Sequence, residues 1–182
     1  EARRAEQRRN VDVVFCIDTS GSMVEKNLMD QAQATLRHCV SNLHKGDRFN
    51  IITFSTEARA MSPSLLEFNE ATKDRALAFI DKMAARGGTA IQEALTLALD
   101  QFSKDQRLKM VFFMTDGQPS IGEVDSDKLV KDINQKNDKG ARVFAFGMGV
   151  DVNAKLLDLL ARENRGEVDF IFGDAISLAF WI

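Results

Sequence analysis

The chain has 182 residues, of which 45% are hydrophobic and 28% charged, and its formal net charge at pH 7 is -3. This length and composition fit one globular domain with a sizeable core, and the slightly acidic balance argues against nucleic acid, whose binders usually present a basic face. No apolar run approaches the roughly 20 residues that a membrane-spanning helix needs, so we expect no direct insertion into a membrane.

The first ten residues differ from the rest of the chain. Residues 1–10 carry four arginines and two glutamates and predict a charged lead-in or linker, followed by one domain over residues 11–182. Both cysteines fall at apolar positions, Cys16 in a predicted strand and Cys39 on the apolar side of a predicted helix. We therefore expect two buried free thiols, which leave the cellular compartment open.

The first half of the domain predicts a strand, a helix and a hairpin. The apolar run Val11–Ile17 is typical of a strand buried on both faces of a parallel sheet. Apolar residues at steps of three and four predict a helix over Val24–Leu43. A strand at Phe49–Phe54 and a weaker, more polar return at Ala58–Met61 predict a hairpin whose second strand is an antiparallel edge strand.

Helices and strands alternate through the rest of the chain. The pattern predicts helices at Thr72–Ala84, Ile91–Phe102, Asp125–Asn137 and Asn153–Glu163, strands at Lys109–Met114, Ala141–Gly147 and Val168–Phe172, and the first part of a final helix at Asp174–Ile182. Such alternation predicts an α/β fold with a doubly wound, mostly parallel sheet that helices cover on both faces.

Three short segments place oxygen-bearing side chains at strand ends or just before a helix. They are Asp18-Thr19-Ser20-Gly21-Ser22, Gly87-Gly88-Thr89 and Thr115-Asp116-Gly117. In open α/β sheets, ligands bind at the carboxyl ends of the strands, where the strand order reverses. We therefore expect the three loops to converge on one crevice, although they are far apart in sequence.

These segments offer the ligands of a hard metal ion. Asp18 and Asp116 supply carboxylates, and Ser20, Ser22 and Thr89 supply neutral hydroxyls. Such oxygens suit Mg²⁺, Ca²⁺ or Mn²⁺ better than zinc. A cation held largely by neutral oxygens would gain from one more anionic ligand, such as an Asp or Glu carboxylate of a partner protein. The plainer alternative is that Asp18 and Ser20 cap a helix and that Asp116 begins an ordinary turn.

The three segments together resemble the metal-ion-dependent adhesion site of the von Willebrand factor type A domain, and the resemblance extends over about Val11 to Phe172. It implies a Rossmann-like, six-stranded sheet of order 3-2-1-4-5-6 with an antiparallel third strand. It also implies one divalent cation, Mg²⁺ first and Ca²⁺ or Mn²⁺ as alternatives. By resemblance, Ser20 and Ser22 would bind the ion directly, Thr89 would do so in the ligand-bound state, and Asp18 and Asp116 would bind directly or through water.

Within that family, the segments Phe15–Met23 and Gly46–Ser55 are most similar to the inter-alpha-trypsin inhibitor heavy chains and related bacterial proteins. The resemblance implies a divalent-cation-dependent module for adhesion or protein interaction, not an enzyme, that captures an acidic side chain of its partner. It favours an extracellular, cell-surface or periplasmic location, and the sequence itself leaves a cytoplasmic one open.

The sequence leaves three other functions open. One is an intracellular module that docks on an ATPase or chelatase assembly, and another is a scaffold whose metal is only structural. A third is a haloacid dehalogenase-like phosphatase, which also places an Asp after its first strand. That enzyme needs an acidic residue two positions later as its acid or base, and Ser20 stands there instead.

Overall fold

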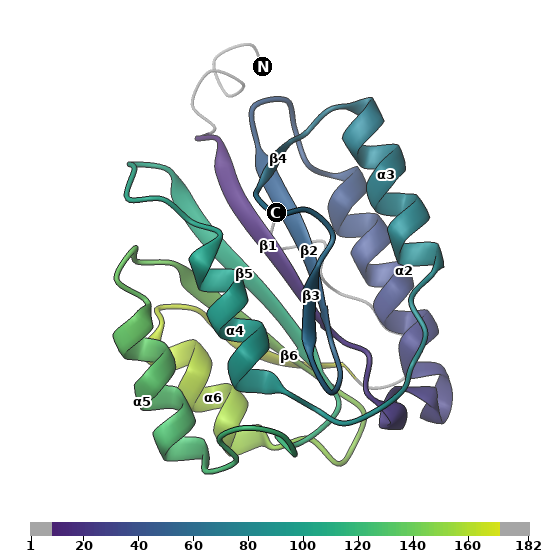
Figure 1. The fold of residues 1–182 in the computed structure, drawn as a ribbon, viewed down its shortest axis with the longest axis vertical. Coiled ribbons are helices and arrows are strands. Elements are labelled where there is room, and N and C mark those ends of the chain that lie inside the picture. Colours follow the sequence, from purple (N-terminus) through teal and green to yellow (C-terminus); the bar gives the residue numbers. More distant parts are fainter. Residues whose placement is uncertain (1–8, 172–182) are drawn as a thin grey trace.

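The computed structural model describes residues 9–171 (Figure 1). Most of the predicted lead-in and the predicted final helix at Asp174–Ile182 lie outside these residues. No helix among the described residues is long and apolar enough to cross a membrane.

A seven-stranded sheet forms the centre of the domain. Its order is β3-β2-β1-β5-β6-β7, and β4 pairs with β2 off this path. Adjacent strands run parallel except that β3 and β4 lie antiparallel to β2. The predicted strand order and antiparallel third strand are therefore confirmed, and β4 is an addition that the sequence did not predict. The strands are β1 (Val11–Asp18), β2 (Arg48–Phe54), β3 (Ala58–Ala60), β4 (Leu66–Glu67), β5 (Leu108–Thr115), β6 (Arg142–Met148) and β7 (Val168–Ile171).

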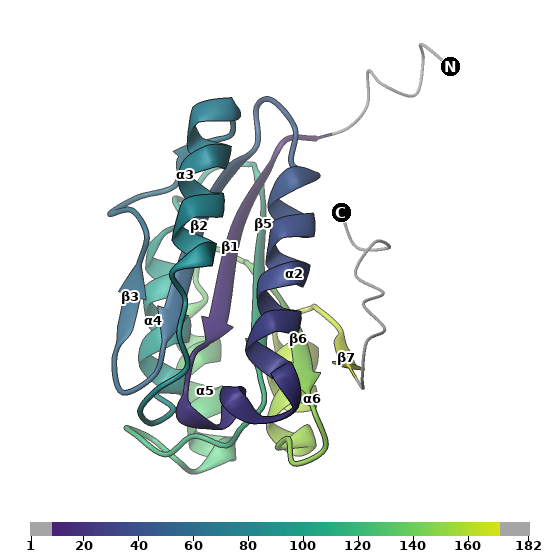
Figure 2. The same ribbon diagram turned by 90° about the vertical axis from the view of Figure 1, so that its right-hand side faces the viewer.

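Helices cover both faces of the sheet, as the alternating pattern predicted. Helices α2 and α3 pack on one face, and α4, α5 and α6 pack on the other (Figures 1 and 2). The helices are the 3-10 helix η1 (Gly21–Asn27), α2 (Leu28–Ser41), α3 (Glu70–Asp81), α4 (Ile91–Asp100), α5 (Ser126–Lys136) and α6 (Ala154–Glu163).

The side chains of β1 divide between two hydrophobic cores. Phe15 and Ile17 pack towards α2 and α3, while Val14 and Cys16 pack towards α4, α5 and α6. Every residue of β1 is buried, which is what a near-continuous apolar run in a central parallel strand predicts. Cys39 lies in the other core from Cys16, and both are free, so the expectation of two buried thiols is confirmed.

The predicted helix at Val24–Leu43 is wrong in its first turn. Residues Gly21–Asn27 form the 3-10 helix η1, and the α-helix begins only at Leu28. Asn27 adopts a left-handed conformation with φ of 57°, which separates the two helices and which Asn tolerates better than most residues. The tighter winding of η1 carries Met23 into the core with no exposed surface, while its neighbours Ser22 and Val24 stay exposed.

Candidate functional site

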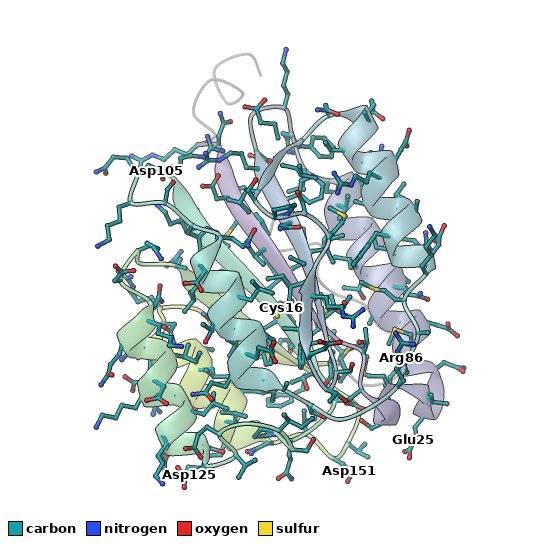
Figure 3. The ribbon with its side chains drawn as sticks, in the orientation of Figure 1. Cys16, Glu25, Arg86, Asp105, Asp125 and Asp151 are labelled. Atoms are coloured by element: carbon teal, nitrogen blue, oxygen red, sulfur yellow. The ribbon has the colours of Figure 1, made fainter. Side chains whose placement is uncertain are left out.

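Three loops meet where the central strands end. Strands β1 and β5 are parallel neighbours in which Ile17 lies beside Met114, so the residues that follow them share one edge of the sheet. This is the lower edge in Figure 3, along which the labelled side chains of Glu25, Asp125 and Asp151 lie. The loop between α3 and α4 reaches the same edge. The three predicted segments, which are far apart in the sequence, thus lie at the same edge of the sheet.

Asp18 is held in place by two hydrogen bonds. Its side chain has no exposed surface. The Oδ1 atom accepts a hydrogen bond from the backbone N–H of Ser20 at 2.7 Å, and the Oδ2 atom accepts one from the Thr115 hydroxyl at 2.5 Å. The carboxylate is therefore fixed from both sides, by its own loop and by the neighbouring strand.

Two consecutive hydroxyl contacts connect the loop that follows β1 to Asp116. The Oγ atoms of Ser20 and Ser22 lie 3.2 Å apart, and the Ser22 hydroxyl donates to Oδ1 of Asp116 at 3.0 Å. Ser20 and Asp116 are buried, whereas Ser22 is exposed. The structure therefore brings these three predicted ligands together. With Asp18 and Thr89 they form a group of five side chains, called the cluster below, in which Ser22 lies at the surface.

Thr89 completes the cluster from the third loop. A Cβ atom added at Gly117 would lie 3.8 Å from the Thr89 Oγ1 and 4.0 Å from the Ser22 Oγ. Gly117 thus leaves a space that the hydroxyls of Thr89 and Ser22 both border. A residue with a side chain would fill that space, and the glycine keeps it open.

Main-chain hydrogen bonds join the three loops to one another. The N–H of Gly21 donates to the carbonyl of Gly87 at 3.0 Å, and the N–H of Arg86 donates to the carbonyl of Thr19 at 2.8 Å. On the other side, the carbonyl of Thr89 accepts from the N–H of Ser120 at 3.0 Å. The cluster is therefore assembled by the backbone as well as by its side chains.

The two carboxylates of the cluster are buried, and no described side chain forms an ion pair with either. Burial raises the pKa of the Asp18 carboxyl to about 6, and its hydrogen bonds with Ser20 and Thr115 oppose part of that rise. Burial also raises the pKa of the Asp116 carboxyl, and the negative charge of Glu25 raises it further. None of the ion pairs among the side chains that the structure describes, which leave out that of Lys26, includes Asp18 or Asp116. A positive ion at this place would relieve the cost of keeping both groups ionised.

The helix-capping alternative does not describe this geometry. Ser20 is the N-cap residue of η1, but its side chain makes no capping hydrogen bond. Asp18 accepts the N–H of Ser20 and the hydroxyl of Thr115, and Asp116 is bonded to Ser22 of a distant loop. Both aspartates therefore do more than shape a local turn.

Two residues that the sequence does not predict as site residues support the cluster. Thr115 belongs to one of the three predicted segments, and its hydroxyl both donates to Asp18 and accepts the N–H of Gly117 at 3.2 Å. The Ser120 hydroxyl accepts the N–H of Thr89 at 2.9 Å. Thr115 could have been found from its place beside Asp116 at a strand end, whereas nothing in the sequence marks Ser120.

The chemistry of the cluster fits a hard cation. In the described part of the chain, no group of three or more His, Cys, Asp or Glu side chains gathers in a way that could hold a metal. The five predicted residues instead offer two carboxylates and three hydroxyls, an all-oxygen set that suits Mg²⁺, Ca²⁺ or Mn²⁺. Together with the space left by Gly117 and the two carboxylates that no described side chain pairs, these donors fit a divalent ion.

Comparisons with known proteins agree with the fold. A family model described as von Willebrand factor type A domain matches residues 11–170. The human inter-alpha-trypsin inhibitor heavy chain H4 is 32% identical over 174 residues, which cover 91% of this chain and 19% of that protein. The chain thus spans about a fifth of the length of this curated relative.

Solved structures show the same architecture. A von Willebrand factor type A protein from Catenulispora acidiphila aligns with a TM-score of 0.79 and 24% identity, covering 91% of this chain and 39% of that one. Proximal thread matrix protein 1 from the mussel byssus, in a structure with a zinc-occupied MIDAS motif, aligns with a TM-score of 0.71 and 22% identity, covering 89% of this chain and 41% of that one. At these sequence identities, the similarity shows a shared fold and nothing further.

Proposed function

Because the chain belongs to the von Willebrand factor type A domain family, we propose that it is a divalent-cation-dependent protein-binding module. In this proposal, Ser20, Ser22 and Thr89 bind one Mg²⁺ through their hydroxyl oxygens, and Asp18 and Asp116 bind it directly or through water. The ion then takes an Asp or Glu carboxylate of a partner protein as a further ligand. The domain acts by binding and not by catalysis.

The observation that carries this proposal is the pair of buried carboxylates within an oxygen-only cluster. Asp18 and Asp116 are 0% and 8% exposed, and neither forms an ion pair with any side chain that the structure describes. Buried charges are normally paired or coordinate a metal. The zinc-occupied MIDAS motif of proximal thread matrix protein 1, a structure with this fold, also supports a divalent ion here.

The bound ion would supply a positive charge with room for an external anionic ligand. The protein supplies everything that holds it. Thr115 and the backbone of Ser20 orient Asp18, and the Ser22 hydroxyl orients Asp116. The three hydroxyls carry no charge. Where they are the direct ligands and the two carboxylates act through water, the positive charge of the ion is only partly offset. The remaining attraction favours a partner that brings its own carboxylate.

Exposed apolar side chains near the cluster support a protein as the partner. Val24, Val124 and Val150 are 68%, 55% and 65% exposed, and they lie in the segments that follow β1, β5 and β6. All three segments are at the sheet edge that carries the cluster. A protein surface that covers this edge would bury them, whereas a free small acid would not.

Calorimetry tests the cation site directly. We expect Mg²⁺, Ca²⁺ or Mn²⁺ to give a measurable binding heat and to raise the melting temperature. Asp116→Ala should abolish that binding and leave the circular dichroism spectrum unchanged. Asp151→Ala is the matched control, because Asp151 is an exposed carboxylate on the same edge and outside the cluster.

Two results would contradict the proposal. One is the absence of any heat or thermal shift with all three cations at millimolar concentration. The other is equal cation affinity in Asp116→Ala and Asp151→Ala, which would remove Asp116 from the ligand set. A pull-down from the native source, with and without EDTA, then tests whether partner capture needs the ion.

A further inference from the structure

A polar cavity opens directly beside the cluster. It has a volume of about 500 Å³ and lies between the turn that joins β2 to β3 and the segment that follows α3. Its lining residues include Thr19, Ser55 and Thr56 and the basic residues Lys82 and Arg86. Figure 3 shows Arg86 on the side of the molecule that carries α2 and α3, towards the edge where the cluster lies.

The cavity shares a wall with the proposed metal site. Thr19 lines it and stands between Asp18 and Ser20 in the chain. Gly87 also lines it, and its carbonyl accepts the N–H of Gly21 in the ligand loop. Gly87 has φ of 78°, and a Cβ there would come within 2.6 Å of the Thr56 hydroxyl, so the chain at this wall must stay free of a side chain.

The charge of the cavity is positive. Arg59 and Glu57 both line the cavity and form an ion pair with each other, so their charges cancel. Lys82 and Arg86 take part in none of the ion pairs found among residues 9–171, and both are exposed. The cavity is therefore lined by one lysine and one arginine that no described acidic side chain pairs, and an ammonium and a guanidinium group suit a carboxylate.

The floor of the cavity favours a side chain over a free anion. Phe79 and Met83 line it and are partly buried against the core. An Asp or Glu side chain can pack its methylene groups on this apolar floor and direct its carboxylate to the cations, which inorganic anions cannot do. Because the cavity adjoins the metal site, one segment of a partner can reach both.

We propose that this cavity binds a second acidic side chain of the partner segment whose first carboxylate binds the metal ion. The inference rests on the proposed function and makes the partner motif more specific: two acidic residues close together in one segment. The first provides metal-dependent binding. The second, held by Lys82 and Arg86, selects doubly acidic segments over singly acidic ones.

Labelled peptides test this selection. The probes are fluorescein-labelled glycine peptides that contain one Glu, or two Glu separated by one, two or three glycines, measured by fluorescence anisotropy in millimolar Mg²⁺. We expect one of the two-Glu peptides to bind about twofold to fivefold more tightly than the one-Glu peptide, a gain typical of exposed ion pairs. The gain should shrink as salt is added.

Matched variants assign the gain to the cavity. The double variant Lys82→Gln/Arg86→Gln should bind one-Glu and two-Glu peptides equally, because both changes are at exposed side chains and leave the metal site intact. The variant Lys131→Gln removes a lysine from α5, outside the cavity, and should keep the full preference for two Glu.

The outcomes separate this inference from the proposed function. Equal binding of all peptides that still requires Mg²⁺ would overturn the second acidic site and leave the proposed function standing. Peptide binding that persists in EDTA, or no binding at all, would overturn both. Binding of inorganic sulfate that depends on Lys82 and Arg86, without a gain from the second Glu, would assign the cavity to free anions and overturn the inference.

Discussion

The hydroxyl of Thr115, at the end of β5, donates a hydrogen bond of 2.5 Å to Oδ2 of Asp18, at the end of the neighbouring parallel strand β1. The two residues are 97 positions apart in the sequence. This contact connects the ends of β1 and β5, and it fixes the direction in which the Asp18 carboxylate points. Loss of the contact should therefore weaken cation binding.

Replacing Thr115 by Val should weaken Mg²⁺ binding roughly tenfold to a hundredfold, the range seen when a residue that orients a metal ligand is lost. Valine keeps the shape of threonine but cannot donate to Asp18. Isothermal titration calorimetry measures the change. Thr115→Ser retains the hydroxyl and should stay close to the wild-type affinity. Equal affinity in the Val and Ser variants would show that this hydrogen bond does not support the site.

The space at Gly117 predicts a second variant. Gly117→Ala would place a methyl group 3.8 Å from the Thr89 hydroxyl and 4.0 Å from the Ser22 hydroxyl, which are ordinary van der Waals distances. The fold should accept it, but the methyl group would occupy space that a cation and its ligands need, so affinity should fall at least about tenfold. Gly21→Ala is the control, because its methyl group would instead face the Gly87 carbonyl at 3.5 Å. Undiminished Mg²⁺ binding in Gly117→Ala would place the ion elsewhere.

Removal of the metal should lower the melting temperature. At a Mg²⁺ concentration of about 100 times Kd, binding stabilises the folded state by about 2.7 kcal/mol, which corresponds to roughly 5–10 °C for a domain of this size. EDTA should abolish this shift. In Asp18→Asn the shift should be absent, and in EDTA the variant should melt at or above the wild type, because a buried charge without a counter-ion has been removed. Differential scanning fluorimetry measures both, and an Asp18→Asn variant that is strongly destabilised in EDTA would contradict this account.

A charged network at the opposite edge of the sheet should affect stability and leave metal binding unchanged. Asp12 is fully buried and pairs with Arg48 at 2.5 Å and with Arg107 at 2.6 Å. Asp12→Asn would leave Arg107 without its carboxylate partner and Arg48 with Asp105 alone, and should lower the free energy of unfolding in urea by about 2–4 kcal/mol.

The control for that variant is an exposed pair. Glu57 and Arg59 are more than half exposed, so Arg59→Gln should change stability by less than about 1 kcal/mol. Mg²⁺ affinity should be unchanged in Asp12→Asn, since the network lies at the other ends of the strands. A loss of cation binding in that variant would mean that the two edges are coupled.

Both thiols should be inert in the folded protein. Burial raises the pKa of Cys39 to about 12 and raises the pKa of Cys16 well above its usual range, so neither forms the reactive thiolate at neutral pH. Ellman's reagent should label no thiol in the native state and two after unfolding in guanidinium. Labelling of the native protein, or fewer than two thiols after unfolding, would be inconsistent with two buried free cysteines.

Much of the fold was predictable because the central strands are buried on both faces. The runs at Val11–Ile17 and Lys109–Met114 have almost no polar residues, and such runs are typical of a parallel sheet that lies between helices. The helix ends were predicted less well. Residues Gly21–Asn27 form a 3-10 helix, a winding that the 3.6-residue period of an apolar stripe cannot distinguish from the start of an α-helix.

The supporting contacts of the site were not predictable in the same way. The five candidate ligands come from short segments with recognisable chemistry at strand ends. Ser120 has no such signal, because its contact with Thr89 depends on how two loops meet in space. Strand β4 is also a product of tertiary structure, since Leu66–Glu67 forms a strand only by pairing with the start of β2.

The backbone hydrogen bonds that join the three loops have a kinetic consequence. Since Gly21, Arg86 and Ser120 already link the loops through their N–H groups, an arriving ion needs no large rearrangement of the chain. The speed of capture is then governed by how readily the ion sheds its own water. Mg²⁺ dehydrates reluctantly and Ca²⁺ much less so, and Ca²⁺ should therefore enter faster even if Mg²⁺ is the ion that finally remains.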